Sequence, residues 1–274
     1  SRGLGDVYKR QVYAPVTNWV WGGGIMAGWG VMDFAGGIVV HTTAGTAALV
    51  VAIVLGKRAG FPALLNPPHS PILTMIGASM LWVGWFGFNG GSALAAGQNA
   101  GMAIMVTHIA AAVGALVWMV AEWLRFGRPS LVGIATGMVA GLATVTPASG
   151  FIGIPGGLIL GFGGGLVCYF AVDLIRGKLN IDDSLDVFAV HGVGGILGSL
   201  MVAVLATEGF SGAGLAEGVS MGEQFMVQLT CVAITFIWTA VASFAILKLV
   251  GAFVPLRVSN GVEVEGLDLA QHGE

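Results

Sequence analysis

Charged side chains are scarce in this chain. Only 9% of its 274 residues are Asp, Glu, Lys or Arg, whereas roughly a quarter of the residues in a soluble domain are charged. Apolar residues make up 56% and the mean hydropathy is +0.88. These values exclude an ordinary soluble domain and predict an integral membrane protein in contact with lipid. The small net charge of -3 provides no basic surface, so no nucleic-acid partner is expected.

Cysteine is also rare. Cys168 and Cys231 lie in separate apolar stretches, where a thiol behaves as a small buried hydrophobe. We therefore expect no disulfide, no metal site and no resident cofactor. Glycine is abundant by contrast, at 46 residues, which lets helices approach closely in lipid. We predict an all-α polytopic membrane protein with tightly packed helices.

Seven hydrophobic stretches approach the length of about 20 residues that a helix needs to cross a membrane. An eighth, near residues 12–20, is too short and resembles the end of a helix whose beginning is absent. We therefore interpret the chain as an N-terminally truncated fragment. The predicted spans cover residues 35–56, 72–95, 100–122, 131–148, 154–175, 186–206 and 223–252.

The first eleven residues differ from the rest. Residues 1–11 (SRGLGDVYKRQ) contain three of the eleven basic residues and lack the apolar core of a signal peptide. They resemble translated sequencing-adapter sequence, so we interpret them as a non-native leader. We assign residues 12–257 to the transmembrane domain and residues 258–274 to a cytoplasmic tail.

The other eight basic residues predict the topology. All of them follow or flank the ends of odd-numbered spans, whereas the loops near residues 96–99, 149–153 and 207–222 contain no Lys or Arg. By the positive-inside rule, these bare loops are external and the C-terminus is cytoplasmic. We expect a multi-pass protein of the cell (inner) membrane. The eight residues are Lys57, Arg58, Arg125, Arg128, Arg176, Lys178, Lys248 and Arg257.

Two histidines lie within the apolar stretches in matching contexts. His41 follows Asp33 by eight residues, and His191 follows Asp183 by the same interval. An ionisable ring at lipid depth is a candidate functional residue. The predicted topology makes the two Asp-to-His units run in opposite directions, as in inverted-repeat transporters. Eight helical residues rise about 12 Å, so both rings fall near the middle of a core about 30 Å thick. We predict that they meet.

The other polar residues have simpler interpretations. Asp33 and Asp183 are expected to cap helix starts, and Asp33 also supplies negative potential for a cation at the outer face. Asp182 is expected to be solvated. His108 has no matching aspartate and no twin, so it is interpreted as a packing residue. His69 and His272 are assigned to a loop and to the tail.

Aromatic residues gather toward the predicted outer face. One group lies between Trp21 and Trp29, and the other lies in the sequence WVGWFGFNGGS at residues 82–92. Tryptophan often anchors a helix at the membrane interface, but an indole face also attracts cations. The clustering favours a cation-recruitment site with aromatic gating below it.

Six motifs follow one another along residues 12–274: VWGGG, MDFAGG with VVH, GWFGFNGGSA, ATVTPASGFIG, DVFAVHGVGG and AEGVSMG. In order and spacing they resemble the ammonium transporter (Amt/MEP/Rh) family of bacterial type. The resemblance implies eleven spans with inverted repeats, an external N-terminus and a cytoplasmic C-terminus. This chain would then contain the end of helix four and helices five to eleven.

The resemblance also implies a set of site residues along a path from the outer face to the pore. It assigns ammonium recruitment to Trp21 and Ser92, and a stacked phenylalanine gate to Phe88. It assigns the hydrogen-bonded pore histidines to His41 and His191. Supporting roles fall to Asp33, Trp85 and Thr146.

Ammonium/ammonia transport is the expected function, and no enzyme activity is expected. A bare cation in an apolar pore costs on the order of tens of kcal/mol in the ideal Born limit. We therefore expect recruitment of ammonium, deprotonation, and conduction of ammonia past the twin histidines, which relay the proton or organise water. Potassium has no proton to lose and would be excluded.

Two alternatives remain. One is an ammonium sensor of the same fold, although sensors carry an appended signalling domain and the short tail favours a transporter. The other is a membrane protein in which paired histidines ligate haem, which a Soret band would reveal. The family resemblance further implies a homotrimer with one pore in each protomer. The tail sequences EGLD and HGE also resemble the segment through which a P-II signalling protein controls such channels.

Overall fold

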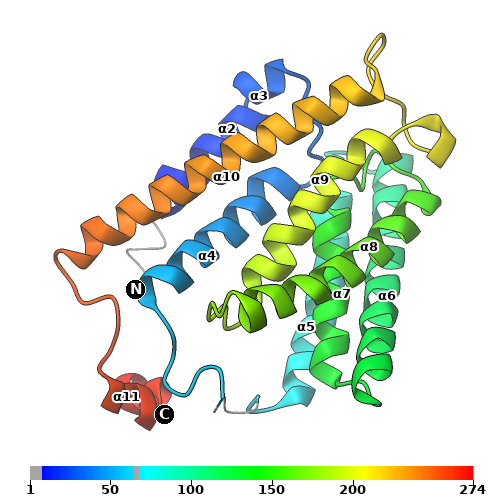
Figure 1. Ribbon diagram of the computed structural model, residues 1–274. Helices are drawn as coiled ribbons and strands as arrows, with labels where there is room; N and C mark the ends of the chain where they lie inside the picture. Colours follow the sequence, from blue (N-terminus) through cyan, green and yellow to red (C-terminus); the bar gives the residue numbers. More distant parts are fainter. Residues whose placement is uncertain (1–7, 64–67, 274) are drawn as a thin grey trace.

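The protein is an assembly of helices throughout the part of the chain that the computed structural model describes, residues 8–63 and 68–273 (Figure 1). Every regular element in these ranges is a helix, so the predicted all-α polytopic fold is confirmed. The predicted leader at residues 1–11 falls partly outside the described residues, which begin at Tyr8. Residues 9–13 form a π-helical turn that leads directly into α2.

Apolar helices lie in all seven predicted spans. Six of these helices in the described ranges have the length and hydropathy to cross a membrane, whereas α7 has only 15 residues. The predicted span 131–148 was too long at its end because Pro147 has no backbone N–H with which to continue the helix. The spanning segments are Gly37–Leu55 (η2 and α4), Pro71–Gly91 (α5), Gln98–Phe126 (α6), Ile154–Lys178 (α8 and η3), Phe188–Leu205 (η4 and α9) and Met221–Gly251 (α10), with Leu131–Val145 (α7) as the shorter helix.

Shorter elements complete the chain. They include α2, which precedes the first full span, and α11 and η6 in the tail, near the end of the molecule where α5 begins (Figure 1). The short elements are Lys9–Tyr13 (η1), Ala14–Trp21 (α2), Ile25–Gly28 (α3), Glu208–Phe210 (η5), Asn260–Glu265 (α11) and Asp268–His272 (η6).

Serine side chains begin three of the spans' helices. Ser70, Ser130 and Ser220 each accept a hydrogen bond from a backbone N–H in the first turn of α5, α7 and α10, respectively. At α10 the contact is reciprocal, because Glu223 also accepts from the Ser220 backbone. These contacts satisfy amides that have no partner within the helix.

Glycines allow α6, α7 and α8 to pack closely, as the composition predicts. A Cβ added at Gly161 of α8 would lie 2.7 Å from the Ala110 carbonyl of α6, and one added at Gly137 of α7 would lie 2.6 Å from the Gly114 carbonyl. Real Cβ atoms do not tolerate such distances. The backbones therefore approach to a separation that only glycine permits.

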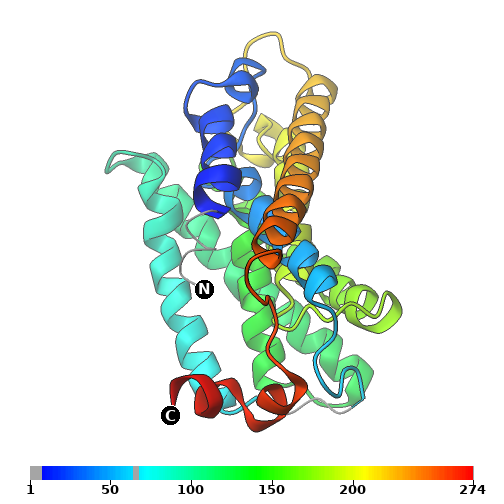
Figure 2. The ribbon, with the colours of Figure 1, turned by 90° about the vertical axis from the view of Figure 1, so that its left-hand side faces the viewer.

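Two more glycines mark the place where the two Asp-to-His units cross. α4 and α9 run in opposite directions (Figure 1). A Cβ at Gly45 would overlap the backbone of Gly192, and a Cβ at Gly195 would lie 2.6 Å from the His41 Cβ. Each of these two glycines follows its histidine by four residues, so the same spacing opens both helices at their crossing point. Figure 2 shows α10 lying alongside this crossing.

Candidate functional site

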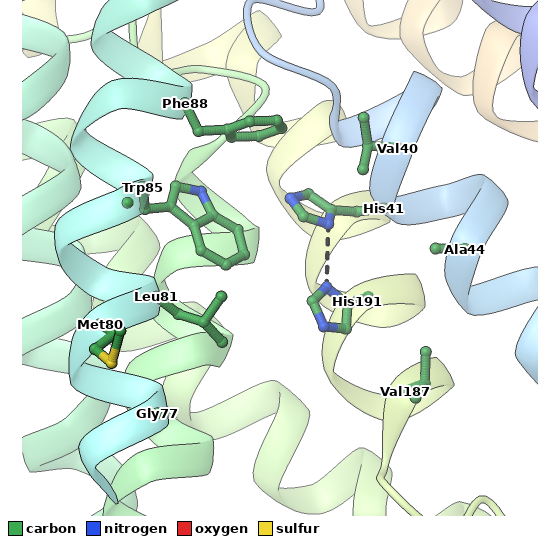
Figure 3. A pocket seen from close by; sticks show the side chains of 11 residues that line it. Val40, His41, Ala44, Gly77, Met80, Leu81, Trp85, Phe88, Val187 and His191 are labelled. Carbon is green, nitrogen blue, oxygen red and sulfur yellow. Dashed lines mark hydrogen bonds between the residues drawn. The ribbon is translucent and has the colours of Figure 1, made fainter. Parts of the chain in front are cut away.

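The two histidines meet, as the sequence predicts. The Nδ1 atoms of His41 and His191 are 3.1 Å apart, with the ring planes inclined by 27° (Figure 3). Each ring projects from a π-helical turn, η2 for His41 and η4 for His191. Two ring nitrogens at this distance share one hydrogen, so one ring donates and the other accepts. The contact is therefore incompatible with both rings being doubly protonated.

The two aspartates make the predicted capping contacts. Asp33 accepts four backbone N–H bonds of 2.6 to 3.0 Å from the residues that start η2. Asp183 accepts three, of 2.8 to 3.4 Å, at the start of η4. In each unit, a carboxylate thus fixes the beginning of the turn that carries the histidine.

Trp85 and Phe88 of α5 face the histidines across a cavity of about 700 Å³. The Trp85 ring stacks on His41 with 5.5 Å between centroids and an interplanar angle of 18°. Its Nε1 donates to Thr146 Oγ1 at 2.9 Å, which fixes the indole. Phe88 lies 6.4 Å from the His41 ring. Figure 3 shows these side chains converging on one space.

The cavity is almost entirely apolar. Apart from the imidazole nitrogens and the Trp85 indole N–H, its lining consists of hydrocarbon, the Met80 thioether and glycine. His41 Nε2 is buried and has no hydrogen-bond partner among the described residues. In Figure 3 this nitrogen faces the side occupied by Trp85 and Phe88. An uncharged molecule that donates or accepts a hydrogen bond would find its polar contacts at the histidines.

Trp21 and Ser92 belong to different elements and do not line this cavity. The Trp21 side chain is 43% exposed, and its Nε1 donates to the Asp33 carbonyl at 2.7 Å. Ser92 caps the end of α5 and donates to the Phe88 carbonyl at 2.9 Å. No hydrogen bond joins the two side chains; Trp21 is linked to Asp33 and Ser92 is linked to Phe88.

The remaining predicted polar residues lie away from the twin-histidine contact. His108 is exposed and packs against Trp82 and Phe86, in agreement with its interpretation as a packing residue. His69 is an exposed loop residue, whereas His272 ends the short helix η6. Both cysteines are buried free thiols. Within the described ranges, no group of three or more His, Cys, Asp or Glu side chains is arranged to hold a metal ion.

The expectation that Asp182 is solvated is wrong. Its side chain is buried and accepts three hydrogen bonds from Arg58, which come from the backbone N, Nε and Nη2 at 2.7 to 2.8 Å. Burial acts to raise the pKa of Asp182, but these hydrogen bonds outweigh it and hold that pKa below its usual range. This contact could not be predicted from the sequence, because Arg58 lies 124 residues away from Asp182.

Sequence reasoning also missed two glutamines. Gln224 and Gln228 of α10 are buried and hydrogen-bond the loop that precedes Asp33. Their spacing of four residues places them on one face of the helix, which was a usable signal. Nothing in the sequence indicated which segment that face would contact.

Comparison with known proteins gives consistent results. The chain matches the family described as Ammonium Transporter Family over residues 5–274. It is 50% identical over 273 residues to Ammonium transporter Amt1 of Archaeoglobus fulgidus, covering 99% of this chain and 68% of that protein. It is 44% identical to an ammonium transporter of Aquifex aeolicus, covering 96% of this chain and 61% of the relative.

Solved structures give the same match. Mep2 of Saccharomyces cerevisiae superposes with a TM-score of 0.81 at 35% identity, covering 93% of this chain and 61% of that chain. A protein described as Sensor Amt Protein superposes with a TM-score of 0.88 at 32% identity, covering 95% and 66%. The chain thus spans 61 to 68% of the length of these four proteins.

Proposed function

Because this chain belongs to the ammonium transporter family, we propose that it contains the conducting site of a transporter that recruits ammonium, removes a proton and conducts ammonia. The observation that carries this proposal is the Nδ1 to Nδ1 contact of His41 and His191 at 3.1 Å on the wall of an apolar cavity. Such a wall offers hydrogen bonds to a neutral molecule but little that replaces the hydration of an ion.

Recruitment is assigned to Trp21 and Ser92 at the outer face. The partly exposed Trp21 ring provides an aromatic face for a cation, and the Ser92 hydroxyl provides an acceptor. Phe88, whose carbonyl already accepts from Ser92, would gate the step into the cavity. The Asp33 carboxylate is fully engaged by backbone N–H groups, so its role is to hold the site in shape.

The histidine pair would conduct ammonia, while the proton removed from ammonium crosses separately through the shared hydrogen bond or a water chain and rejoins ammonia on the other side, so that one net charge crosses. In the shared hydrogen bond, one Nδ1 carries the hydrogen and the other accepts it. His41 Nε2 is buried and has no hydrogen-bond partner among the described residues, so its contact with ammonia or a water molecule requires a neighbouring side chain to move. Potassium lacks a proton to give up, so the same path would exclude it.

A sensor of the same fold is the second candidate. It is favoured by one observation, the TM-score of 0.88 to the protein described as Sensor Amt Protein. The curated relatives with higher identity are described as ammonium transporters, and this favours transport. Ligation of haem is not supported by the geometry. A haem iron held between two axial nitrogens, with bonds of about 2.0 Å, would separate them by about 4 Å, which is more than the observed contact of 3.1 Å.

We also propose the setting in which the transporter works. The chain would lie in the cell (inner) membrane, with the C-terminus cytoplasmic, as a homotrimer with one pore in each protomer. A P-II signalling protein would bind the tail at residues 258–274. The tail already contacts the loop after α4, because Glu263 accepts from the Ala59 backbone N–H at 2.7 Å. No enzyme activity is proposed.

Ammonium-elicited current in proteoliposomes containing the full-length protein tests the conducting site. Replacing both His41 and His191 with alanine is expected to abolish the selective current, and a variant with one histidine is expected to admit potassium. Undiminished and equally selective current in the double variant would rule out conduction past the histidines.

A further inference from the structure

Gln228 of α10 lies outside the residues assigned to transport, yet its side chain is fully buried and fully hydrogen-bonded. Its Nε2 donates to the carbonyls of Met32 and Ser199 at 2.8 and 2.7 Å. Its Oε1 accepts from the Met32 N–H at 2.8 Å and from Gln224 Nε2 at 3.2 Å. Both amide hydrogens and both acceptor positions are therefore occupied.

The hydrogen bonds of Gln228 hold a segment that has no regular secondary structure. Residues 31–33 belong to no helix, and both backbone groups of Met32 are held by the Gln228 side chain. Gln224 adds a bond to the Gly30 carbonyl at 3.1 Å. An amide buried in a membrane helix is costly unless its partners are well placed. The contacts of Gln228 meet that condition with three bonds to backbone and one to a side chain.

The clamped segment leads directly to the outer site. The residue after Met32 is Asp33, whose carbonyl accepts the Trp21 indole N–H at 2.7 Å. The Trp21 ring also covers Gly36, where an added Cβ would lie 3.3 Å from the indole. A continuous chain of short contacts thus runs from α10 through Met32 and the Asp33 carbonyl to Trp21.

We propose that Gln228 is a positioning residue for cation recruitment, which fixes the Asp33 carbonyl through Met32 and thereby sets the place of the Trp21 indole. This inference rests on the proposed recruitment role of Trp21. The histidine contact depends on a different part of Asp33, its carboxylate, which caps η2. Loss of Gln228 should therefore weaken recruitment more than conduction.

Gln228→Leu in the full-length protein tests the proposal through ammonium-elicited current. We expect the half-saturating ammonium concentration to rise about tenfold and the maximal current to change less than about twofold, because small displacements of a binding group are costly. Thr239→Val is the matched control. Thr239 is an equally buried polar residue of α10, its hydroxyl has no hydrogen-bond partner among the described residues, and its replacement should leave both values unchanged.

A double-mutant cycle with Trp21→Phe separates positioning from general support of the fold. Trp21→Phe keeps an aromatic face but removes the N–H that contacts the Asp33 carbonyl. In that background, Gln228→Leu should raise the half-saturating concentration less than about threefold, because coupled residues are not additive. Additive effects of the two substitutions would overturn the inference.

Two further outcomes decide the remaining cases. If Gln228→Leu does not accumulate, Gln224→Leu is the second variant, because it removes only the hydrogen bond to the Gly30 carbonyl and the one to Gln228. It should raise the half-saturating ammonium concentration about threefold, since displacing a binding group weakens its contact. An unchanged half-saturating concentration would overturn the inference. Unchanged half-saturation in Gln228→Leu, with normal current in the unsubstituted protein, overturns the inference alone. Absence of ammonium-elicited current in the unsubstituted protein overturns the proposed function and the inference with it.

Discussion

The outer and inner Asp-to-His units share spacing and local geometry but are held in place by different chemistry. The outer unit, residues 30–41, is clamped by the neutral glutamines of α10. The inner unit, residues 179–191, is clamped by ion pairs, Arg58 with Asp182 and Arg176 with Asp186. The glutamine side chains are neutral and add no charge beside the outer unit. The ion pairs make the stability of the inner unit responsive to pH and salt.

The inner clamp is also continuous with the tail. Arg257 donates to the Leu55 carbonyl at the end of α4 and pairs with Glu263, which in turn accepts from the Ala59 N–H. Leu55, Arg257 and Glu263 border a cavity of about 570 Å³, which shares Val187 with the cavity of the twin histidines. The inner unit is therefore linked to the tail through ion pairs, whereas the outer unit has no corresponding ion-pair network in the described residues.

Gly45→Ala is expected to have the largest effect, because it breaks the crossing that both units share. The added methyl would overlap the Gly192 backbone, so we expect destabilisation of about 2 to 3 kcal/mol and loss of transport. Thermal unfolding in detergent and ammonium current measure the two effects. Gly101→Ala on α6 is the control, because an added Cβ there meets nothing within 4 Å; equal stability of the two variants would contradict the prediction.

Replacing each aspartate with asparagine sharpens the comparison between the units. Asp33→Asn should lower the free energy of unfolding by about 2 to 4 kcal/mol. The Asp33 carboxylate accepts four backbone N–H bonds, and an asparagine amide has only one oxygen to accept them, so some of these buried N–H groups would lose their partner. Asp183→Asn should cost about 1 to 2 kcal/mol, because one of its three bonds is already 3.4 Å long. Chemical denaturation measures both values. A larger loss for Asp183→Asn would show that the inner cap is the stronger.

Asp186→Asn should remove a pH-dependent component of the stability of the inner unit, together with the ion pair to Arg176. Burial raises the pKa of Asp186 to about 6 from an ordinary value of 3.8, although Arg176 opposes this. Between about pH 4 and pH 6, the carboxyl group of Asp186 is therefore protonated in the folded protein but ionised in the unfolded chain. Asp186 thus stabilises the folded protein at low pH, and this stabilisation is lost as the pH rises through about 6. Melting temperatures at several pH values should show this component in the unsubstituted protein and not in Asp186→Asn; identical profiles would contradict it.

The sequence was sufficient for features that depend on spacing within a segment. The interval from each aspartate to its histidine, together with the loop charges, predicted both the caps and the meeting of His41 with His191. Pairings across long separations could not be predicted. Gln228 is 196 residues from Met32, and a polar residue in an apolar helix does not indicate its partner. The early end of α7 was predictable in principle, because Pro147 is visible in the sequence.

The crossing of α4 and α9 also has a consequence for synthesis. His41 leaves the ribosome 150 residues before its partner, an interval of roughly 8 to 30 s at about 5 to 20 residues per second. During that time the first imidazole must enter the membrane without the ring that will share its hydrogen. The hydrogen bond between His41 and His191 can therefore form only after the segment that contains His191 has been translated and inserted.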